Sequence, residues 1–148
     1  MLETSGPPPS DTTVSFVAGT PRVIVMRHGP PENIVFARIT FPATSFADSG
    51  QLVNVELRPR PGVYGLDMTI SSPPRPGVIV VFEFSRYFSA PARAQEVYRS
   101  NAAFERALAV GRLLPDNYIE LLPSVESEID EVGAAVSGAG SYLVAAPQ

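Results

Sequence analysis

Cysteine and lysine are both absent from the 148-residue sequence, and each absence excludes a class of function. Without cysteine the chain has no disulfide, no thiol nucleophile and no cysteine-based zinc site. All 11 basic residues are arginines, and they occur singly from Arg22 to Arg112 rather than in a cluster. A nucleic-acid surface needs a concentrated positive field, and the formal net charge here is −4. We therefore expect no nucleic-acid binding.

Histidine is nearly absent and tryptophan is absent altogether. The one histidine, His28, cannot supply the group of nitrogen and sulfur ligands that transition metals prefer. We therefore expect no metal and no other cofactor. The lack of tryptophan also weighs against a carbohydrate-binding module, which stays open as an alternative.

Long apolar runs are missing as well. No run approaches the ~20 residues that a membrane-spanning helix needs, and residues 1–10 lack the basic start and apolar middle of a signal peptide. Three consecutive prolines at 7–9 favour extended polyproline II structure. We expect residues 1–12 to be a flexible, proline-rich tether and residues 13–148 to be one domain. Such a tether suggests that an export signal or anchor has been removed ahead of it, and any membrane association would come through it.

What the sequence does contain is a series of short β-rich segments separated by turns. The 16 prolines and 11 glycines divide the chain at regular intervals. We expect strands at 13–17, 22–27, 34–41, 51–58, 62–70, 78–84, 106–113, 118–122, 132–136 and 141–146. One helix is expected at 91–104, because Ala92, Ala94, Gln95, Glu96, Ala102 and Ala103 favour a helix and Pro91 suits its first turn. This pattern predicts an all-β fold, an antiparallel two-sheet sandwich of about ten short strands with one inserted helix.

Two local expectations follow from side-chain spacing. Leu52, Val55 and Leu57 do not keep a strict period of two, which predicts a β-bulge near Val53 and Asn54. In the helix, Val97, Tyr98 and Phe104 are expected to face the sandwich.

The segment 25–29, with the letters VMRHG, resembles the Arg-His-Gly signature of the histidine-phosphatase superfamily. In that family a histidine accepts the phosphoryl group and a second histidine lies beside it. His28 is the only histidine in this chain, and Pro30 and Pro31 follow where a helix would cradle phosphate. The enzyme reading around Arg27, His28 and Gly29 is therefore the least favoured, and His28 is expected to be a turn residue.

An acidic run is formed by Glu126, Glu128, Asp130 and Glu131. Carboxylate oxygens could bind Ca²⁺ there. The spacing matches no calcium loop, and the glycine that shapes an EF-hand is missing. A solvated acidic turn is the simpler interpretation, although the sequence leaves Ca²⁺ binding at 126–131 open.

Three units, in order along residues 34–146, resemble the β-sandwich domain that zona occludens proteins, netrin receptors and ankyrins share, the ZU-type domain, in its bacterial surface-protein version. The first unit is ITFPATSF at 39–46 followed by LVNVEL at 52–57. The second is YGLD at 64–67 leading through RPG at 75–77 to VIVVFEF at 78–84. The third is LAV at 108–110 with IELLPS at 119–124, VGAAV at 132–136 and GSYLVA at 140–145.

The resemblance implies a binding or scaffolding module of a larger assembly. Two features depart from the family pattern, because Thr44 replaces a glycine and residues 85–104 form an insert. Some relatives cleave themselves at a His-Phe-Ser before the last strand. Here the matching positions are Ala139, Gly140 and Ser141, so the base is missing and we expect Ser141 not to act as a nucleophile.

The function favoured by these observations is a non-enzymatic interaction or structural scaffold domain of an exported or cell-envelope protein. Its location would be periplasmic, cell-surface or extracellular. A protein partner or self-association is expected, because aromatic and arginine side chains are the usual binding hot spots. The candidate partner-binding residues lie in the insert and in the turn after residue 57: Arg86, Tyr87, Phe88, Arg93, Tyr98, Arg99, Arg58 and Arg60. No catalytic residue is assigned.

Overall fold

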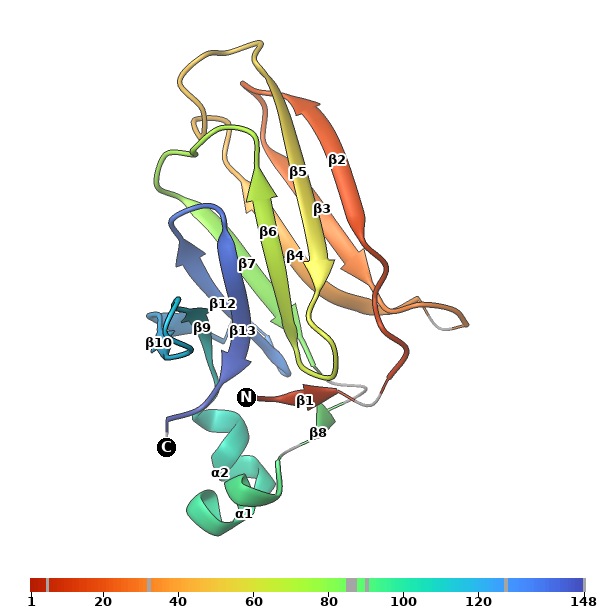
Figure 1. Ribbon diagram of the computed structural model, residues 1–148, viewed down its shortest axis with the longest axis vertical. Helices are drawn as coiled ribbons and strands as arrows, with labels where there is room; N and C mark the ends of the chain where they lie inside the picture. Colours follow the sequence, from red (N-terminus) through yellow and green to blue (C-terminus); the bar gives the residue numbers. More distant parts are fainter. Residues whose placement is uncertain (5, 32, 85–87, 90, 127, 148) are drawn as a thin grey trace.

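The protein is an antiparallel two-sheet sandwich, as the sequence predicts (Figure 1). The structure is a computed structural model that describes residues 1–4, 6–31, 33–84, 88–89, 91–126 and 128–147. In spatial order, the six-stranded sheet consists of β10 (Ile119–Leu121), β9 (Ala109–Leu113), β13 (Gly140–Ala145), β6 (Gly65–Ile70), β5 (Leu52–Pro59) and β2 (Thr12–Val17). The five-stranded sheet consists of β11 (Ser124–Val125), β12 (Glu131–Val136), β7 (Val78–Glu83), β4 (Val35–Phe41) and β3 (Arg22–Arg27). A two-stranded ribbon joins β1 (Glu3–Thr4) to β8 (Phe88–Ser89).

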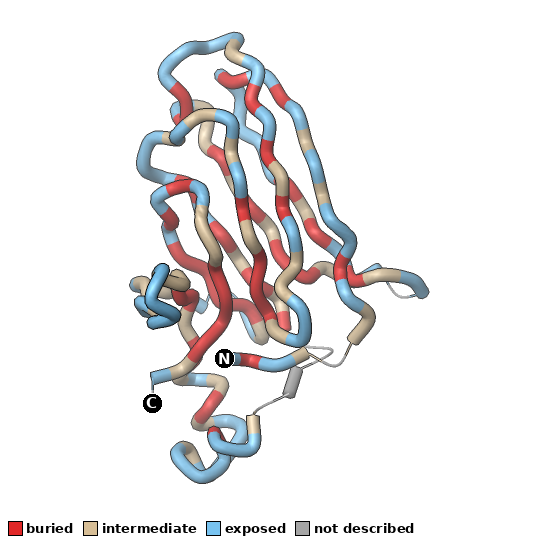
Figure 2. Tube along the Cα trace, viewed as in Figure 1, coloured by how far each residue is buried: buried red, intermediate tan, exposed pale blue. Residues whose placement is uncertain are grey.

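The core lies between the two sheets, and along strands such as β5 and β7 buried residues alternate with more exposed ones (Figure 2). In β5 the inward residues are Val53, Val55 and Leu57, all at most 1% exposed. Leu52, by contrast, is 62% exposed on the outer face. The period of two is therefore strict, and β5 pairs with β2 and with β6 without a register shift. The predicted bulge near Val53 and Asn54 is wrong, because Leu52 does not belong to the buried set.

The irregularity that does occur lies between β3 and β4, where the register shifts between Met26 and Arg27. Phe36 is the extra residue there, and both Phe36 and Ala37 are fully buried. A bulge turns consecutive side chains of one strand toward the same side. This one places the ring of Phe36 in the core, where it lies edge-on to Phe82 with ring centroids 5.9 Å apart.

The N-terminal segment is packed against the sandwich, which corrects the expectation of a flexible tether at 1–12. Leu2 is fully buried. Its backbone N–H donates to the carbonyl of Val144 at 2.8 Å, and its carbonyl accepts from the N–H of Tyr64 at 3.0 Å. Further along, Pro9 forms an isolated bridge with His28. The three prolines therefore run along the fold, because residues on both sides of them are held by backbone bonds.

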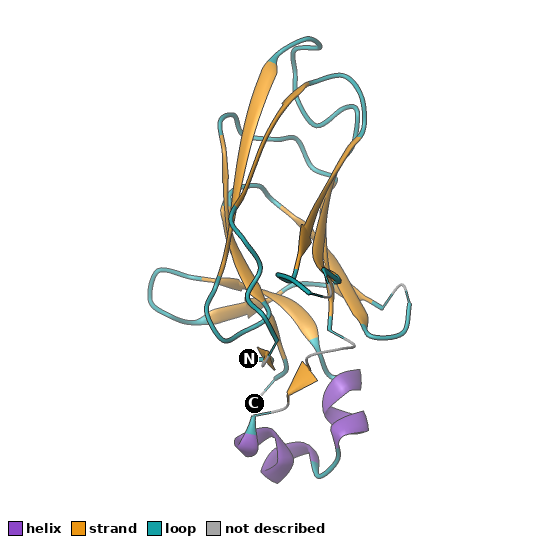
Figure 3. Ribbon diagram, turned by 90° about the vertical axis from the view of Figure 1, so that its right-hand side faces the viewer, coloured by secondary structure: helices purple, strands orange, loops and turns teal. Residues whose placement is uncertain are grey.

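The expected helix is divided into α1 (Ala92–Tyr98) and α2 (Asn101–Arg106) (Figure 3). Arg99 ends α1 in the left-handed region, with φ at 61°. Ser100 then begins α2, because its hydroxyl accepts a hydrogen bond from the N–H of Ala103 at 3.1 Å. Arg106, expected to open a strand, is the last residue of α2. Among the described residues, neither helix has the length and apolar character needed to cross a membrane.

Candidate partner-binding surface

Two neighbouring hollows lie at the end of the sandwich where the helices pack. The helix hollow is lined by Arg93, Val97, Tyr98, Phe104, Ala146 and Pro147, among others. The β10 hollow is lined by Tyr118, Ile119 and Leu121 on one side and by Met1, Ala146 and Pro147 on the other. Met1, Ala146 and Pro147 border both hollows. The two hollows therefore form one surface, which we call the end surface.

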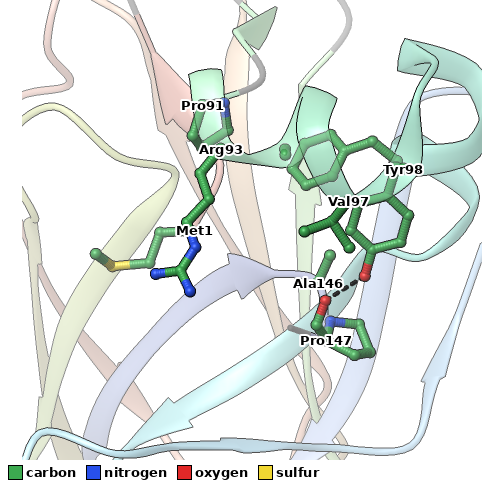
Figure 4. Close-up of a pocket in the computed structure, with 9 residues that line it drawn as sticks. Met1, Pro91, Arg93, Val97, Tyr98, Ala146 and Pro147 are labelled. Atoms are coloured by element: carbon green, nitrogen blue, oxygen red, sulfur yellow. Dashed lines mark hydrogen bonds between the residues drawn. The ribbon is translucent and has the colours of Figure 1, made fainter.

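The helices are held at this place by two aromatic side chains. The Tyr98 hydroxyl donates a hydrogen bond to the carbonyl of Pro147, drawn as a dashed line in Figure 4. The ring of Tyr98 lies edge-on to that of Phe104, with centroids 5.6 Å apart. Phe104 and Ala94 are buried, which confirms the predicted inward position of Phe104. These contacts fix the position of α1 beside the end of β13.

Several apolar side chains of the end surface stay exposed. Val97 is 53% exposed, although the helix pattern predicted that it would face the sandwich. Figure 4 shows Val97 pointing toward Ala146, at the rim of the helix hollow, and Arg93 extending toward Met1. Across the β10 hollow, Tyr118 is 71% exposed and Leu121 is 37% exposed. Exposed apolar groups around a depression are typical of places where another molecule binds.

The size and charge of the end surface restrict what fits there. The helix hollow has a volume of about 130 Å³, well below the ~300–1,000 Å³ of drug-sized ligand sites. It suits one apolar side chain of a partner. The β10 hollow is larger, at about 400 Å³, and both hollows are open to solvent to a similar degree. Among the described residues, Arg93 is the one charged side chain that lines either hollow.

No family model, curated protein sequence or solved structure matches this chain. The resemblance to the ZU-type domain thus stays a prediction. The function has to be inferred from the geometry of the molecule.

The structure brings together some of the candidate residues predicted in the insert. Arg93 and Tyr98 both line the helix hollow. Arg99 is exposed, and its backbone N–H donates to the carbonyl of Gln95 as the cap of α1. Arg99 adopts a left-handed conformation because it caps α1. It does not line either hollow.

The other candidate residues of the insert, Arg86, Tyr87 and Phe88, lie wholly or partly outside the described structure. Phe88 lies in β8, opposite Thr4 of β1, and its side chain is outside the part that the structure describes. Arg86 and Tyr87 lie outside the described residues. Their predicted roles in partner binding remain predictions.

Arg58 and Arg60 belong to a different surface, the outer face of the six-stranded sheet. Arg58 donates to the Glu56 carboxylate at 2.6 Å and is 63% exposed. Arg60 donates to the Asp67 carboxylate at 2.8 Å. The same carboxylate accepts a hydrogen bond from the Ser141 hydroxyl at 2.6 Å. The two arginines are therefore engaged in local pairs, and neither lines the end surface.

His28 is buried and bridges to Pro9, which corrects the expectation that it is a turn residue. It is 2% exposed, and its Nδ1 lies 2.7 Å from the carbonyl oxygen of Pro7. Its ring lies edge-on to Phe36 and to Tyr64, with centroids 5.3 and 6.2 Å away. This position packs the N-terminal segment onto the core. A histidine that exchanges phosphoryl groups with a substrate has to be reached from solvent, and this one is covered.

The acidic run takes part in an ion-pair cluster on the five-stranded sheet. The Arg38 guanidinium donates to both carboxylate oxygens of Glu131, at 3.1 and 3.2 Å, and also to Glu83. Burial, followed by a hydrogen bond with Glu131, raises the pKa of the Glu83 carboxyl. Among the described residues, no three histidine or acidic side chains lie close enough to hold a metal ion. The run thus supplies one carboxylate to a structural ion pair.

Sequence reasoning missed the apolar side of the end surface. Tyr118 was assigned to a strand, although it follows Pro115, Asp116 and Asn117, which are typical turn residues. Asn117 has a φ of 65°, as such a turn requires. That turn signal could have placed Tyr118 at an exposed tip. No local sequence signal predicts that Tyr118 lies near Val97, because the two residues come together only across the end of β13.

Proposed function

We propose that the protein is a non-enzymatic interaction module that binds a protein partner through the end surface, as part of a larger assembly. The observation that carries the proposal is the exposure of Val97, Tyr118 and Leu121 around two adjoining hollows. Burying such side chains against a partner removes apolar area from water, which is the main favourable contribution to association.

The chemistry of the end surface supports one kind of partner. The helix hollow has room for one apolar side chain, and Arg93 stands at its rim as a hydrogen-bond donor. An arginine prefers a carboxylate, which it can hold with two parallel hydrogen bonds. The partner is therefore a protein segment that presents a bulky apolar side chain next to an aspartate or glutamate.

Two further arguments come from the sequence. The resemblance to the ZU-type domain implies a scaffolding role in a larger assembly. The proposed location in the periplasm, at the cell surface or outside the cell now depends on that resemblance, because the N-terminal segment that also suggested export packs against the fold. Fractionation of the source cells would test it separately from the binding surface.

The alternatives have less support. A carbohydrate-binding function needs exposed aromatic rings, and Tyr118 is the one exposed aromatic ring among the side chains that the structure describes. A histidine-phosphatase function needs an accessible nucleophile, whereas His28 is covered by Pro7 and the core rings.

Selection of peptides on the purified protein tests the proposal. A random peptide library is displayed on phage and selected on the wild-type chain, and the enriched peptides are titrated against variants. We expect the peptides to carry a bulky apolar residue beside an acidic one. We also expect Val97→Asp and Tyr118→Asp each to weaken binding at least about tenfold, which corresponds to about 1.4 kcal/mol.

The matched control is Thr69→Asp, which places the same charge at an exposed position of β6 on the polar outer face. This variant should bind the peptides as the wild type does. Enriched peptides whose binding is unaffected by Val97→Asp and Tyr118→Asp would contradict the proposal, and so would a selection that enriches nothing.

A further inference from the structure

The four edge strands of the two sheets differ in how well they are protected from pairing with another chain. β10 is three residues long and contains Glu120, and β11 has two residues. β3 begins and ends with Arg22 and Arg27, and its register against β4 is shifted. Short length, charge and bulges are the devices that natural proteins use to block sheet extension. Three of the four edges therefore carry at least one of them.

The remaining edge, β2, carries none of these devices. Its sequence is TTVSFV, six residues without charge or proline and rich in strand formers. It pairs with β5 in one continuous register. Figure 1 shows β2 at the margin of its sheet, and no other described strand pairs with its outer side.

The register shows which backbone groups face that open side. The backbone N–H of Ala18, which follows β2, donates to the carbonyl of Gln51, which precedes β5 in the same chain, at 2.8 Å. The carbonyl of Asn54 accepts from Ser71 at 2.9 Å, on the side of β5 away from β2. Bonding alternates along an antiparallel pair, so Thr12, Val14 and Phe16 exchange their bonds with β5. The N–H and C=O groups of Thr13, Ser15 and Val17 consequently point outward.

We propose that β2 pairs with β2 of a second copy of this chain, antiparallel and with the two Ser15 residues opposite each other on a twofold axis. This inference is independent of the end surface. It would join the two six-stranded sheets into one continuous sheet across the dimer.

The strand is self-complementary in this register. Thr13 faces Val17 of the second copy. The three residues whose backbone N–H and C=O groups point away from β5 therefore pair with the same three residues of the second copy. On the inner side, Val14 faces Phe16 of the second copy. Val14 is only half-buried in the single chain, and a β-branched residue opposite an aromatic one is a favourable cross-strand pair.

The charges at the two ends of β2 favour the antiparallel direction. Asp11 precedes the strand and Arg22 follows the turn after it, and both are exposed. An antiparallel pairing places Asp11 of one copy at the same end as Arg22 of the other. A parallel pairing would instead bring the two Asp11 carboxylates together.

The absence of cysteine allows a direct test of this register. Residues in a hydrogen-bonded antiparallel pair have Cα atoms about 5.5 Å apart, within the ~4.4–6.8 Å that a disulfide spans. Ser15→Cys should therefore form a disulfide-linked dimer on mild oxidation. Thr13→Cys should not, because the pairing offsets the two Thr13 residues by about 13 Å along the strands. The double variant Thr13→Cys/Val17→Cys should cross-link again.

Sedimentation velocity of the cysteine-free chain completes the test. We expect a weak dimer whose fraction rises with concentration. Ser15→Pro removes the outward N–H of Ser15 and should yield a monomer. Ser15→Ala loses the same hydroxyl, which bonds Asn54, but keeps the N–H and should still dimerise. Circular dichroism checks that both variants are folded.

Three results would overturn the inference. The first is a wild-type chain that stays monomeric at every concentration. That result is expected if the β2 edge pairs with a strand of a different protein instead. The second is equal cross-linking of Ser15→Cys and Thr13→Cys. The third is a folded Ser15→Pro variant that dimerises as Ser15→Ala does.

Discussion

The ring of Phe36 in β4 stacks on the ring of Tyr64, with centroids 5.4 Å apart and planes inclined by 11°. Tyr64 immediately precedes β6, so this contact joins the five-stranded sheet to the six-stranded sheet. Both side chains are fully buried, and His28 lies edge-on to each of them. The contact thus ties together the β3–β4 bulge, the core and the N-terminal segment that covers His28.

Removing the Phe36 ring should be among the most damaging single changes. Phe36→Ala leaves a cavity between the sheets, which the sheets cannot close without losing register. We expect the free energy of unfolding to fall by about 3–5 kcal/mol, measured by urea denaturation. Val23→Ala, at a position that is 51% exposed, is the control and should change it by less than about 0.5 kcal/mol. Similar losses for both variants would contradict the described core.

Leu2 should contribute to stability as a core residue does, because it is fully buried and both of its backbone groups are bonded. Leu2→Ala is expected to lower the free energy of unfolding by about 2–5 kcal/mol. Leu52→Ala removes the same atoms at a position that is 62% exposed and should cost far less. If residues 1–12 were a flexible tether, Leu2→Ala would have no measurable effect in the same denaturation experiment.

Gly133 in β12 should tolerate no side chain, because it faces Val81 of β7. A Cβ atom there would lie 2.9 Å from the Val81 Cγ2 atom and 3.3 Å from the carbonyl oxygen of Val80. Gly133→Ala is expected to cost about 1–3 kcal/mol. In a double-mutant cycle, Val81→Ala should recover part of that loss, because it removes the nearest atom. Additive costs of the two changes would argue against the register of β7 and β12.

The raised pKa of Glu83 predicts a pH dependence of stability. A carboxyl with a higher pKa in the folded state binds a proton more tightly there. The stabilisation that the Glu83 carboxyl contributes is complete when the pH is below its pKa in the unfolded state, about 4.3. This stabilisation is lost as the pH rises through the raised pKa of the folded state. Glutamine cannot ionise, so Glu83→Gln avoids this loss.

The free energy of unfolding of Glu83→Gln, minus that of the wild type, should therefore increase as the pH rises from about 4 to 7. Urea denaturation at several pH values measures this difference. A difference that stays constant or decreases over that range would show that the ion pair with Arg38 outweighs burial and contact with Glu131.

The sequence predicts the strands and sheets well because burial in a sandwich follows a local rule. Tyr64, Leu66 and Met68 alternate with outward residues, and all three are buried as that alternation predicts. The helix pattern is also local, but its interruption combines the left-handed conformation of Arg99 with the N-cap that Ser100 forms for α2. No propensity of arginine predicts that conformation, so one helix was expected instead of two.

What the sequence does not predict depends on contacts between distant segments. Only Met1 beside it is apolar among the neighbours of Leu2 in residues 1–10, and backbone bonds to Tyr64 and Val144 hold Leu2 in the core. The end surface arises in the same way, since α1 and the turn before β10 meet across the end of β13. Of the predicted partner-binding residues, Arg93 and Tyr98 line the helix hollow, and their roles in binding remain predictions.

Hydrogen–deuterium exchange of the protein, with and without a peptide selected as described above, measures most directly where a partner binds. We expect binding to slow the exchange of α1 and of residues 117–122, which include β10, with the other strands of both sheets unchanged. Slower exchange confined to the outer face of either sheet, with α1 and residues 117–122 unaffected, would contradict the assignment of the end surface as the binding site.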